Sequence, residues 1–178
     1  MAVLQTILNF FGPATPEEIE APEPAPPSEY FIHPLTSANL EEVIRLNNRC
    51  FRNGENYTRH TFNYLLSEPG TLSYRIVDDQ GKMAGFIFVM ITNEGCGHVT
   101  TIGVAPEHRR RALAQRLLAH TENALIEKGI TAAMLECRVS NLDAQRVYSK
   151  AGYVIVQKIA NYYNNGEDGI LMMKSLFR

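Results

Sequence analysis

The sequence predicts an α+β fold with a mixed, mostly antiparallel central sheet that is flanked by helices. Two apolar runs within residues 73–91 surround the turn-forming stretch DDQGK, a pattern typical of an antiparallel hairpin. Later in the chain, strand-like and helix-like segments alternate, as in strand–helix–strand units. At 178 residues the chain is long enough for one domain with a real core.

The first half of this domain is expected to contain a strand, two helices and the hairpin. YFIHPL, residues 30–35, predicts the strand. Residues 36–51 predict a helix with Thr36 or Ser37 as N-cap. Its apolar face is formed by Leu40, Val43, Ile44 and Cys50. The loop RNGENY then leads to a second short helix near residues 58–67.

The second half is expected to alternate strands and helices. GHVTTIGVAP, residues 97–106, predicts a strand that ends at Pro106, which cannot continue a hydrogen-bonded ladder. A long helix follows and ends at Gly129. The remaining elements are a strand over residues 131–139, a helix over 141–152 and strands over 153–160 and 169–176.

A stretch rich in proline and glutamate separates residues 1–11 from the domain over 30–178. Residues 12–29 hold six of the nine prolines and five glutamates, so they predict an extended linker that buries little. Residues 1–11 carry an apolar stripe at helical spacing and predict a short helix. This helix would pack on its own domain or a neighbouring copy, or dock on another protein. Membrane docking is the weakest option because its polar face has no basic residue.

The composition of the chain argues against several classes of partner and of cofactor. The formal net charge of −2 gives no reason to expect nucleic acid or an anionic membrane. Cys50, Cys96 and Cys137 are odd in number and lack zinc-ligand spacing, so we expect reduced thiols, no metal and a cytoplasmic protein. No apolar run approaches the roughly 20 residues of a transmembrane helix, and no secretory signal is expected.

An arginine cluster precedes the long helix, in HRRRALAQRLL over residues 108–118. A positive charge at a helix N-terminus is unfavourable by about 0.3–1 kcal/mol because it opposes the helix dipole. An interaction that compensates this cost is therefore expected. The cluster is either a solvated charge run or an anion site. The unpaired N–H groups of a helix N-terminus favour a bound polyphosphate.

Several motifs resemble the GNAT superfamily of N-acetyltransferases. Arg109-x-x-Ala112-x-Ala114 is similar to its (Q/R)xxGx(G/A) acyl-CoA pyrophosphate loop. LECRVSNLDAQRVYSKAGY, residues 135–153, and NYYNNGEDGILM, residues 161–172, are similar to the LEVRxSNxxAxxLYxxxGF and NYYxxGEDAxxM segments of RimI-type protein N-terminal acetyltransferases. RNGENY resembles the LPENY loop of eukaryotic N-terminal acetyltransferase catalytic subunits.

This resemblance implies that acetyl-CoA is the co-substrate. The residues expected to bind it are Ile102, Gly103, Val104, Arg109, Arg110, Arg111, Ala112, Leu113, Ala114, Asn141 and Tyr148. The family usually has glycine where this chain has Ala112, and the Cβ adds bulk near the phosphates. Because alanine suits the first turn of a helix, we expect altered affinity for CoA and not a lost site.

Two residues are candidates for proton transfer. Glu136 lies mid-strand on the face opposite Leu135 and Cys137, where the family carries its general base. The alternative is an exposed glutamate on a half-solvated sheet. Tyr148 matches the family's general acid, and a phenol with a pKa of about 10 can protonate a thiolate with a pKa of about 8.5. The alternative is an aromatic used for packing.

The resemblance also implies a groove for the acceptor. Tyr162 and Tyr163 would line it, with Glu55 and Tyr57 on the opposite wall. Glu167 and Asp168 match the family's GED and are expected to organise the loop. The five histidines have no spacing that suggests a metal site, so structural roles are expected for them.

Together these observations predict acetyl transfer to the N-terminal α-amine of a protein or peptide, with a ribosomal protein as one candidate acceptor. The oligomeric state, monomer or dimer, stays open. One rival function keeps the chemistry but acetylates a small-molecule amine or a lysine. Another is a noncatalytic acyl-CoA-binding module, which only Ala112 supports. The NYYNNGED segment argues against the first rival, and the presence of both Glu136 and Tyr148 argues against the second.

Overall fold

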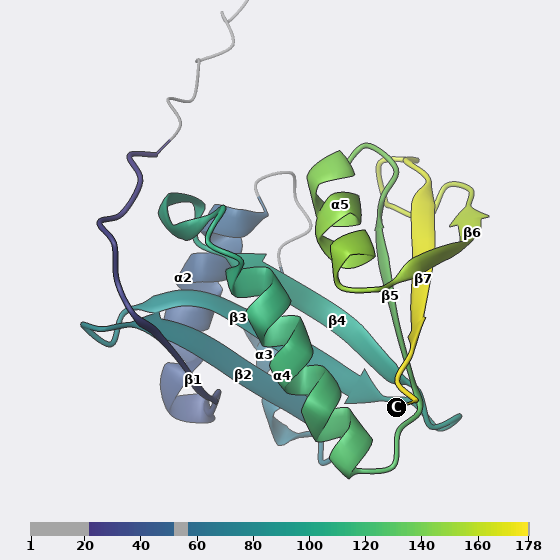
Figure 1. Ribbon diagram of the computed structural model, residues 1–178, viewed down its shortest axis with the longest axis horizontal. Coiled ribbons are helices and arrows are strands. Elements are labelled where there is room, and N and C mark those ends of the chain that lie inside the picture. Colours follow the sequence, from purple (N-terminus) through teal and green to yellow (C-terminus); the bar gives the residue numbers. More distant parts are fainter. Residues whose placement is uncertain (1–21, 52–56, 178) are drawn as a thin grey trace, which may run out of the picture.

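The computed structural model describes residues 22–51 and 57–177, which form an α+β fold around a seven-stranded mixed sheet (Figure 1). The strand order is β1-β2-β3-β4-β5-β7-β6. The strands are β1 Tyr30–Pro34, β2 Thr71–Asp78, β3 Met83–Ile91, β4 Gly97–Val104, β5 Ala132–Arg138, β6 Val154–Ile159 and β7 Gly169–Ser175. The helices are α2 Leu40–Cys50, α3 Arg59–Ser67, α4 Leu113–Glu127 and α5 Leu142–Lys150, with 3-10 turns η1 Ser37–Asn39 and η2 Pro106–His108. The predicted fold class is confirmed.

Helices cover both faces of the sheet, and β3 is buried between them. Its side chains alternate, as the period of a strand requires. Phe86 and Phe88 belong to the core beneath α2 and α3. Ile87 and Val89 belong to the core beneath α4 and α5. In Figure 1, α4 crosses the near face of the sheet, and α2 and α3 lie behind it.

The sheet separates into two parts after the first residues of β4. The parallel pair of β4 and β5 extends over Gly97 with Ala133 and His98 with Met134. The other neighbouring strands are antiparallel and pair over five or more residue pairs each. Beyond His98, one edge of β4 therefore has no strand beside it in the described part of the fold.

The end of the predicted linker lies against the domain. The Ala25 N–H donates to the carbonyl oxygen of Glu107 over 2.9 Å, and Ser28 Oγ accepts from the Asp79 N–H over 3.1 Å. A domain boundary at residue 30 stays a prediction. The predicted helix over residues 1–11 lies outside the described residues, and none of the helices within them could cross a membrane.

Candidate active site

A cavity of about 760 Å³ opens where β4 and β5 diverge. Its walls come from the end of α2, the second half of β4, the end of β5, the start of α5 and the loop between β6 and β7. Residues expected from the sequence to bind ligands or transfer protons meet in this lining, namely Tyr57, Ile102, Glu136, Asn141, Tyr148, Tyr162 and Tyr163. Segments more than 100 residues apart in the chain thus build one site.

Glu136 is half-buried and paired. Its Oε2 lies 2.7 Å from Nε2 of His98 on the neighbouring strand, and the side chains are 16% and 27% exposed respectively. Leu135 and Cys137 are buried on the opposite face, as strand alternation predicts. Glu136 is therefore not the freely exposed glutamate of the alternative interpretation.

His98 is a site residue that sequence reasoning missed, because its spacing suggested only a structural role. The sequence does not give the register in which β4 and β5 pair. His98 pairs with Met134, so its side chain reaches the one two residues further along β5, which is Glu136. A histidine and a glutamate on adjacent parallel strands were visible in the sequence, but their alignment was not.

Tyr148, on α5, lines the cavity. It is 8% exposed, and burial raises the pKa of its phenol well above the ordinary value. Such a hydroxyl stays protonated at neutral pH and is available as a proton donor. The purely packing alternative also finds support, because the Tyr148 ring contacts the ring of Tyr153 at 6.2 Å between centroids.

Asn141 is the N-cap of α5. Its Oδ1 accepts from the Ala144 N–H over 3.1 Å, and the residue also lines the cavity. The cap places the first turn of the helix beside the end of β5. Because Gln145 Nε2 donates to the carbonyls of Arg138 and Val139 over 3.1 and 2.9 Å, this turn is tied to the strand.

The free edge of β4 carries backbone N–H donors, and its residues up to Ile102 line the cavity. The Ala105 N–H donates to the Ala84 carbonyl on the β3 side. Because N–H directions alternate along a strand, those of Ile102 and Val104 point the other way, toward the gap. Gly103 is required for packing, since a Cβ there would lie 2.7 Å from the Phe86 ring and 3.1 Å from Cys50 Sγ.

Aromatic residues form the outer walls. Tyr57 Oη donates to the Thr100 carbonyl over 3.0 Å, and burial raises the pKa of this phenol. Tyr162 and Tyr163 contact each other edge-to-face with centroids 5.1 Å apart. The expected groove residue Glu55 lies outside the described residues.

The arginine loop between β4 and α4 differs from the expectation at Ala112. Helix α4 begins at Leu113, and Ala112 is its N-cap with φ of 57°, so it adopts the left-handed conformation and is not part of the first helical turn. Arg110 also has positive φ, 61°. For residues with a Cβ this conformation costs about 1–2 kcal/mol each, which explains why glycine is usual in this motif.

The three arginines differ in their surroundings. Arg109 Nε donates to the Val104 carbonyl over 3.3 Å, and Arg110 is exposed. Arg111 Nη1 donates to Tyr30 Oη over 2.6 Å. The Leu113 side chain is buried in the core, so only its backbone is available to a ligand. The amides of the first turn of α4 have no side-chain cap, which suits an anion there.

The acetyltransferase (GNAT) family model matches residues 40–153, which is more than half of the chain. The chain belongs to this family. It is an acetyl-CoA-dependent N-acetyltransferase.

Relatives and solved structures agree with this assignment. This GNAT enzyme is 31% identical over 150 residues to the N-terminal acetyltransferase B complex catalytic subunit NAA20 of Arabidopsis thaliana, covering 81% of this chain and 79% of that protein. It is 32% identical over 117 residues to a putative [ribosomal protein bS18]-alanine N-acetyltransferase of Bacillus subtilis, covering 65% and 77%. The structure of the ribosomal-protein-S18-alanine N-acetyltransferase from Escherichia coli matches with a TM-score of 0.75 and 25% identity, covering 84% of this chain and 96% of that one.

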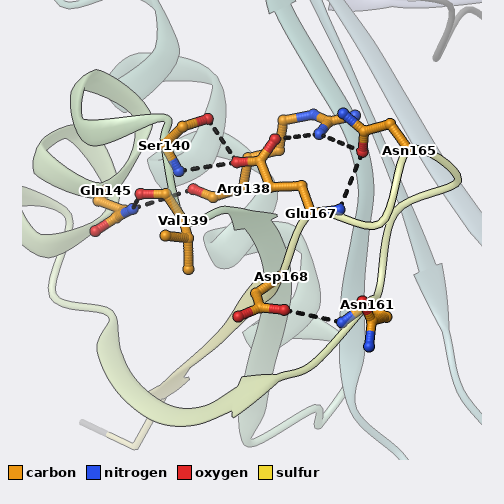
Figure 2. Close-up of polar contacts among 8 residues, drawn as sticks. All are labelled: Arg138, Val139, Ser140, Gln145, Asn161, Asn165, Glu167 and Asp168. Carbon is orange, nitrogen blue, oxygen red and sulfur yellow. Dashed lines mark hydrogen bonds and ion pairs between the residues drawn. The ribbon is translucent and has the colours of Figure 1, made fainter.

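In this GNAT enzyme, the loop between β6 and β7 is held by Glu167, as Figure 2 shows. Its carboxylate accepts from the Arg138 guanidinium, from the Ser140 N–H over 3.0 Å and from the Ser140 hydroxyl over 2.5 Å. These hydrogen bonds, that of the Ser140 hydroxyl above all, hold the pKa of Glu167 below its ordinary value. Arg138 also lies over the Tyr163 ring, 4.1 Å from its centroid.

Asp168 fixes the other end of the same loop. Its Oδ1 accepts from the Asn161 N–H over 2.9 Å, and Asn161 has the left-handed φ of 51° (Figure 2). Its Oδ2 lies 2.8 Å from Lys158 Nζ. Glu167 and Asp168 thus organise the loop, as expected, and the loop presents Tyr162 and Tyr163 to the cavity.

The cavity and the arginine loop together fit an acyl-CoA on chemical grounds, although residues 109–114 of the loop are not part of the cavity lining. An extended pantetheine arm needs backbone partners, and the free edge of β4 offers them. A diphosphate needs N–H donors and positive charge, and the uncapped start of α4 beside Arg109 and Arg110 offers both.

Proposed function

We propose that this enzyme acetylates the N-terminal α-amine of a protein or peptide, with Glu136 as general base and Tyr148 as general acid. The observation that carries the proposal is the meeting of Glu136, which is paired with His98, and the buried Tyr148 phenol in one cavity beside a free strand edge. The names of the relatives from A. thaliana and B. subtilis support the choice of acceptor.

In this proposal the co-substrate lies along the free edge of β4. The backbone of Ile102, Gly103 and Val104 and the amide of Asn141 bind the pantetheine arm. The diphosphate lies at the loop and first turn formed by Arg109, Arg110, Arg111, Ala112, Leu113 and Ala114. Acetyl-CoA supplies the activated acetyl group, and the protein supplies binding, orientation and proton transfer.

Glu136 prepares the nucleophile. A free N-terminal amine has a pKa of about 7.7–8.0, so much of it is protonated at neutral pH. The Glu136 carboxylate accepts that proton, directly or through a water molecule. The hydrogen bond with His98 orients the carboxylate, in the way that a third group orients a catalytic base.

The amine nitrogen then forms a bond with the acetyl carbon. The Val104 N–H stabilises the negative charge that develops on the acetyl oxygen. The carbon–sulfur bond breaks and its electron pair goes to sulfur. Tyr148 donates its proton to that thiolate, and the positively charged nitrogen of the intermediate loses its extra proton to solvent. The protonated Glu136 then releases its proton to solvent and the Tyr148 phenolate takes one up, so that one proton is released per turnover.

Tyr57, Tyr162 and Tyr163, together with Glu55, form the groove for the first residues of the acceptor. Tyrosine rings contact a peptide backbone over a large area and lose little conformational entropy, which suits a groove that reads only a short N-terminus. We further propose a cytoplasmic enzyme whose domain covers residues 30–178, with a ribosomal protein among the acceptors to test.

Acceptor competition tests the proposal. The purified protein is given acetyl-CoA with peptides of varied first residues, with the same peptides blocked at the N-terminus but containing a lysine, and with a polyamine. Acetylation confined to free N-termini supports the proposal. Transfer to lysine or polyamine at equal or greater rates contradicts it, and the library identifies the preferred first residue.

A further inference from the structure

Residues 25–30, which we call the strap, lie against the arginine loop (Figure 1). The strap precedes residue 40, where the match to the family model begins. It includes the end of the predicted linker and the first residue of β1. Several hydrogen bonds join it to the loop and to residues beside the loop, so it does more than connect two segments.

The Arg111 guanidinium is directed into the strap. Nη1 donates to the Pro26 carbonyl over 2.7 Å and to Tyr30 Oη over 2.6 Å, and Nη2 donates to the Ala25 carbonyl. The guanidinium carbon lies 6.0 Å from the centroid of the Tyr30 ring. Arg111 therefore binds a neighbouring segment of its own chain.

Tyr30 connects the strap to residues before, within and after the loop. Its Oη lies 2.9 Å from Nδ1 of His108 in η2, and the two rings meet edge-to-face. The same hydroxyl accepts from Arg111 within the loop. Its carbonyl accepts from Arg116 Nη2 on α4 over 2.7 Å. Because His108 is 3% exposed, the hydroxyl is anchored on a buried partner.

These contacts surround the two strained residues. Arg110 and Ala112 have left-handed φ without being glycine, and Arg111 lies between them. A conformation that disfavours a Cβ persists only where its surroundings hold it. The Arg111 side chain holds the middle of the loop, and the Ala25 N–H holds the Glu107 carbonyl before it.

We propose that the strap braces the diphosphate-binding loop, with Tyr30 and Arg111 as positioning residues that set the affinity for acetyl-CoA. This inference rests on the assignment of the loop to acetyl-CoA in the proposed function. The strap replaces the freedom that glycine provides elsewhere in the family. Ala112 and the strap are therefore two parts of one arrangement.

Calorimetric titration with CoA tests the brace in the full-length protein. Tyr30→Phe keeps the ring but removes the hydroxyl, and we expect the Kd for CoA to rise about tenfold because a hydrogen bond to a charged group is lost. The KM for acetyl-CoA should rise in parallel, whereas kcat and the KM for peptide stay within about twofold. Tyr64→Phe is the matched control, since Tyr64 is 49% exposed on α3.

Measuring Tyr30→Phe in a variant that also carries Ala112→Gly shows whether Tyr30 acts on the loop conformation or on the stability of the whole domain. Glycine adopts the left-handed conformation without support, so Tyr30→Phe should weaken CoA binding less than about twofold in that background. Hydrogen exchange at residues 109–113 should be faster in Tyr30→Phe than in the parent, and this difference should also shrink with Ala112→Gly.

Three results would overturn the inference. Unchanged CoA affinity in Tyr30→Phe shows that the brace does not act. An equal loss in both backgrounds shows that Tyr30 acts on overall stability and not on the loop conformation. A parent protein that does not bind CoA at all refutes the proposed function first, and the brace with it, so the two failures are distinguishable.

Discussion

His98 and Glu136 meet at the point where β4 and β5 part, with 2.7 Å between Nε2 and Oε2. His98 belongs to the last residue pair that joins the two strands, and Glu136 lies two residues beyond it. The proposed base thus lies just beyond the last residue pair between β4 and β5 and is held by a side chain from that pair. The carboxylate is fixed by the scaffold on one side and open to the cavity on the other.

Replacing Glu136 by glutamine should lower turnover by about 10²–10⁴-fold, because the amide keeps the shape but cannot accept a proton. The defect should shrink as pH rises from 6 to 10, since a larger fraction of the amine then arrives deprotonated. CoA binding should survive. Steady-state rates across this range provide the measurement, and a parental rate at neutral pH would show that Glu136 is not the base.

Replacing Tyr148 by phenylalanine should lower turnover at every pH. The proton that Tyr148 donates goes to the leaving thiolate, so deprotonation of the amine at high pH does not replace it. Burial raises the pKa of the phenol, so Tyr148 stays protonated well above pH 10 and the parent should keep its acid across the range. A decline in parental kcat between pH 9 and 10 that Tyr148→Phe abolishes would mean that the phenol ionises there, against this assignment.

Replacing Glu167 by glutamine should raise the KM for peptide several-fold and leave the KM for acetyl-CoA unchanged, because it loosens the loop that carries Tyr162 and Tyr163. The pKa of Glu167 is lower in the folded than in the unfolded protein. Its contribution to the stability of the folded state is therefore fully present above the unfolded pKa of about 4.3 and is lost as the pH falls through the folded pKa. Asp143→Asn on the exposed first turn of α5 is the control. Equal increases of both KM values would count against a role confined to the acceptor.

Cys50 lines the cavity, and burial raises the pKa of its thiol to about 11. A raised pKa leaves less thiolate at a given pH, so alkylation by iodoacetamide should be slow at pH 8. Its rate should keep rising about tenfold per pH unit up to pH 9.5, where a free thiol of pKa about 8.5 has already levelled off. Mass spectrometry of the Cys50 peptide measures this, and a plateau near pH 9 would contradict it.

Two truncations test the boundary of the domain. Removing residues 1–21 should leave peptide acetylation nearly intact, since the strap remains. Removing residues 1–29 also takes away the Ala25 and Pro26 carbonyls that bind Arg111, so the KM for acetyl-CoA should rise. Loss of activity or aggregation in the shorter deletion would assign residues 1–21 to the core or to an obligate interface.

Much of this molecule could be predicted from the sequence because its signals are local. Apolar periodicity, the turn DDQGK, Pro106 and Gly129 delimit the elements near their observed ends. Alternation along LECRV correctly separates Glu136 from Leu135 and Cys137. The Asn141 cap is likewise a local pattern.

The parts that could not be predicted depend on contacts between distant segments. The pairing of His98 with Glu136 requires the register of two parallel strands that are joined by a crossover helix. The direction of Arg111 requires the path of a proline-rich segment 80 or more residues earlier. The left-handed φ of Ala112 runs against the helical preference of alanine, so propensity pointed to the wrong conformation.

The short ladder between β4 and β5 has a consequence for the lifetime of the protein. Among the described residues, only two residue pairs of β4 and β5 join the two parts of the sheet, so a ligand bound in the gap would contact both strands and link them. A ligand that binds only the folded state stabilises it by RT ln(1 + [L]/Kd). We therefore expect the melting temperature and protease resistance to follow the acetyl-CoA concentration. Metabolic supply would then set how long each copy of the enzyme survives as well as how fast it works.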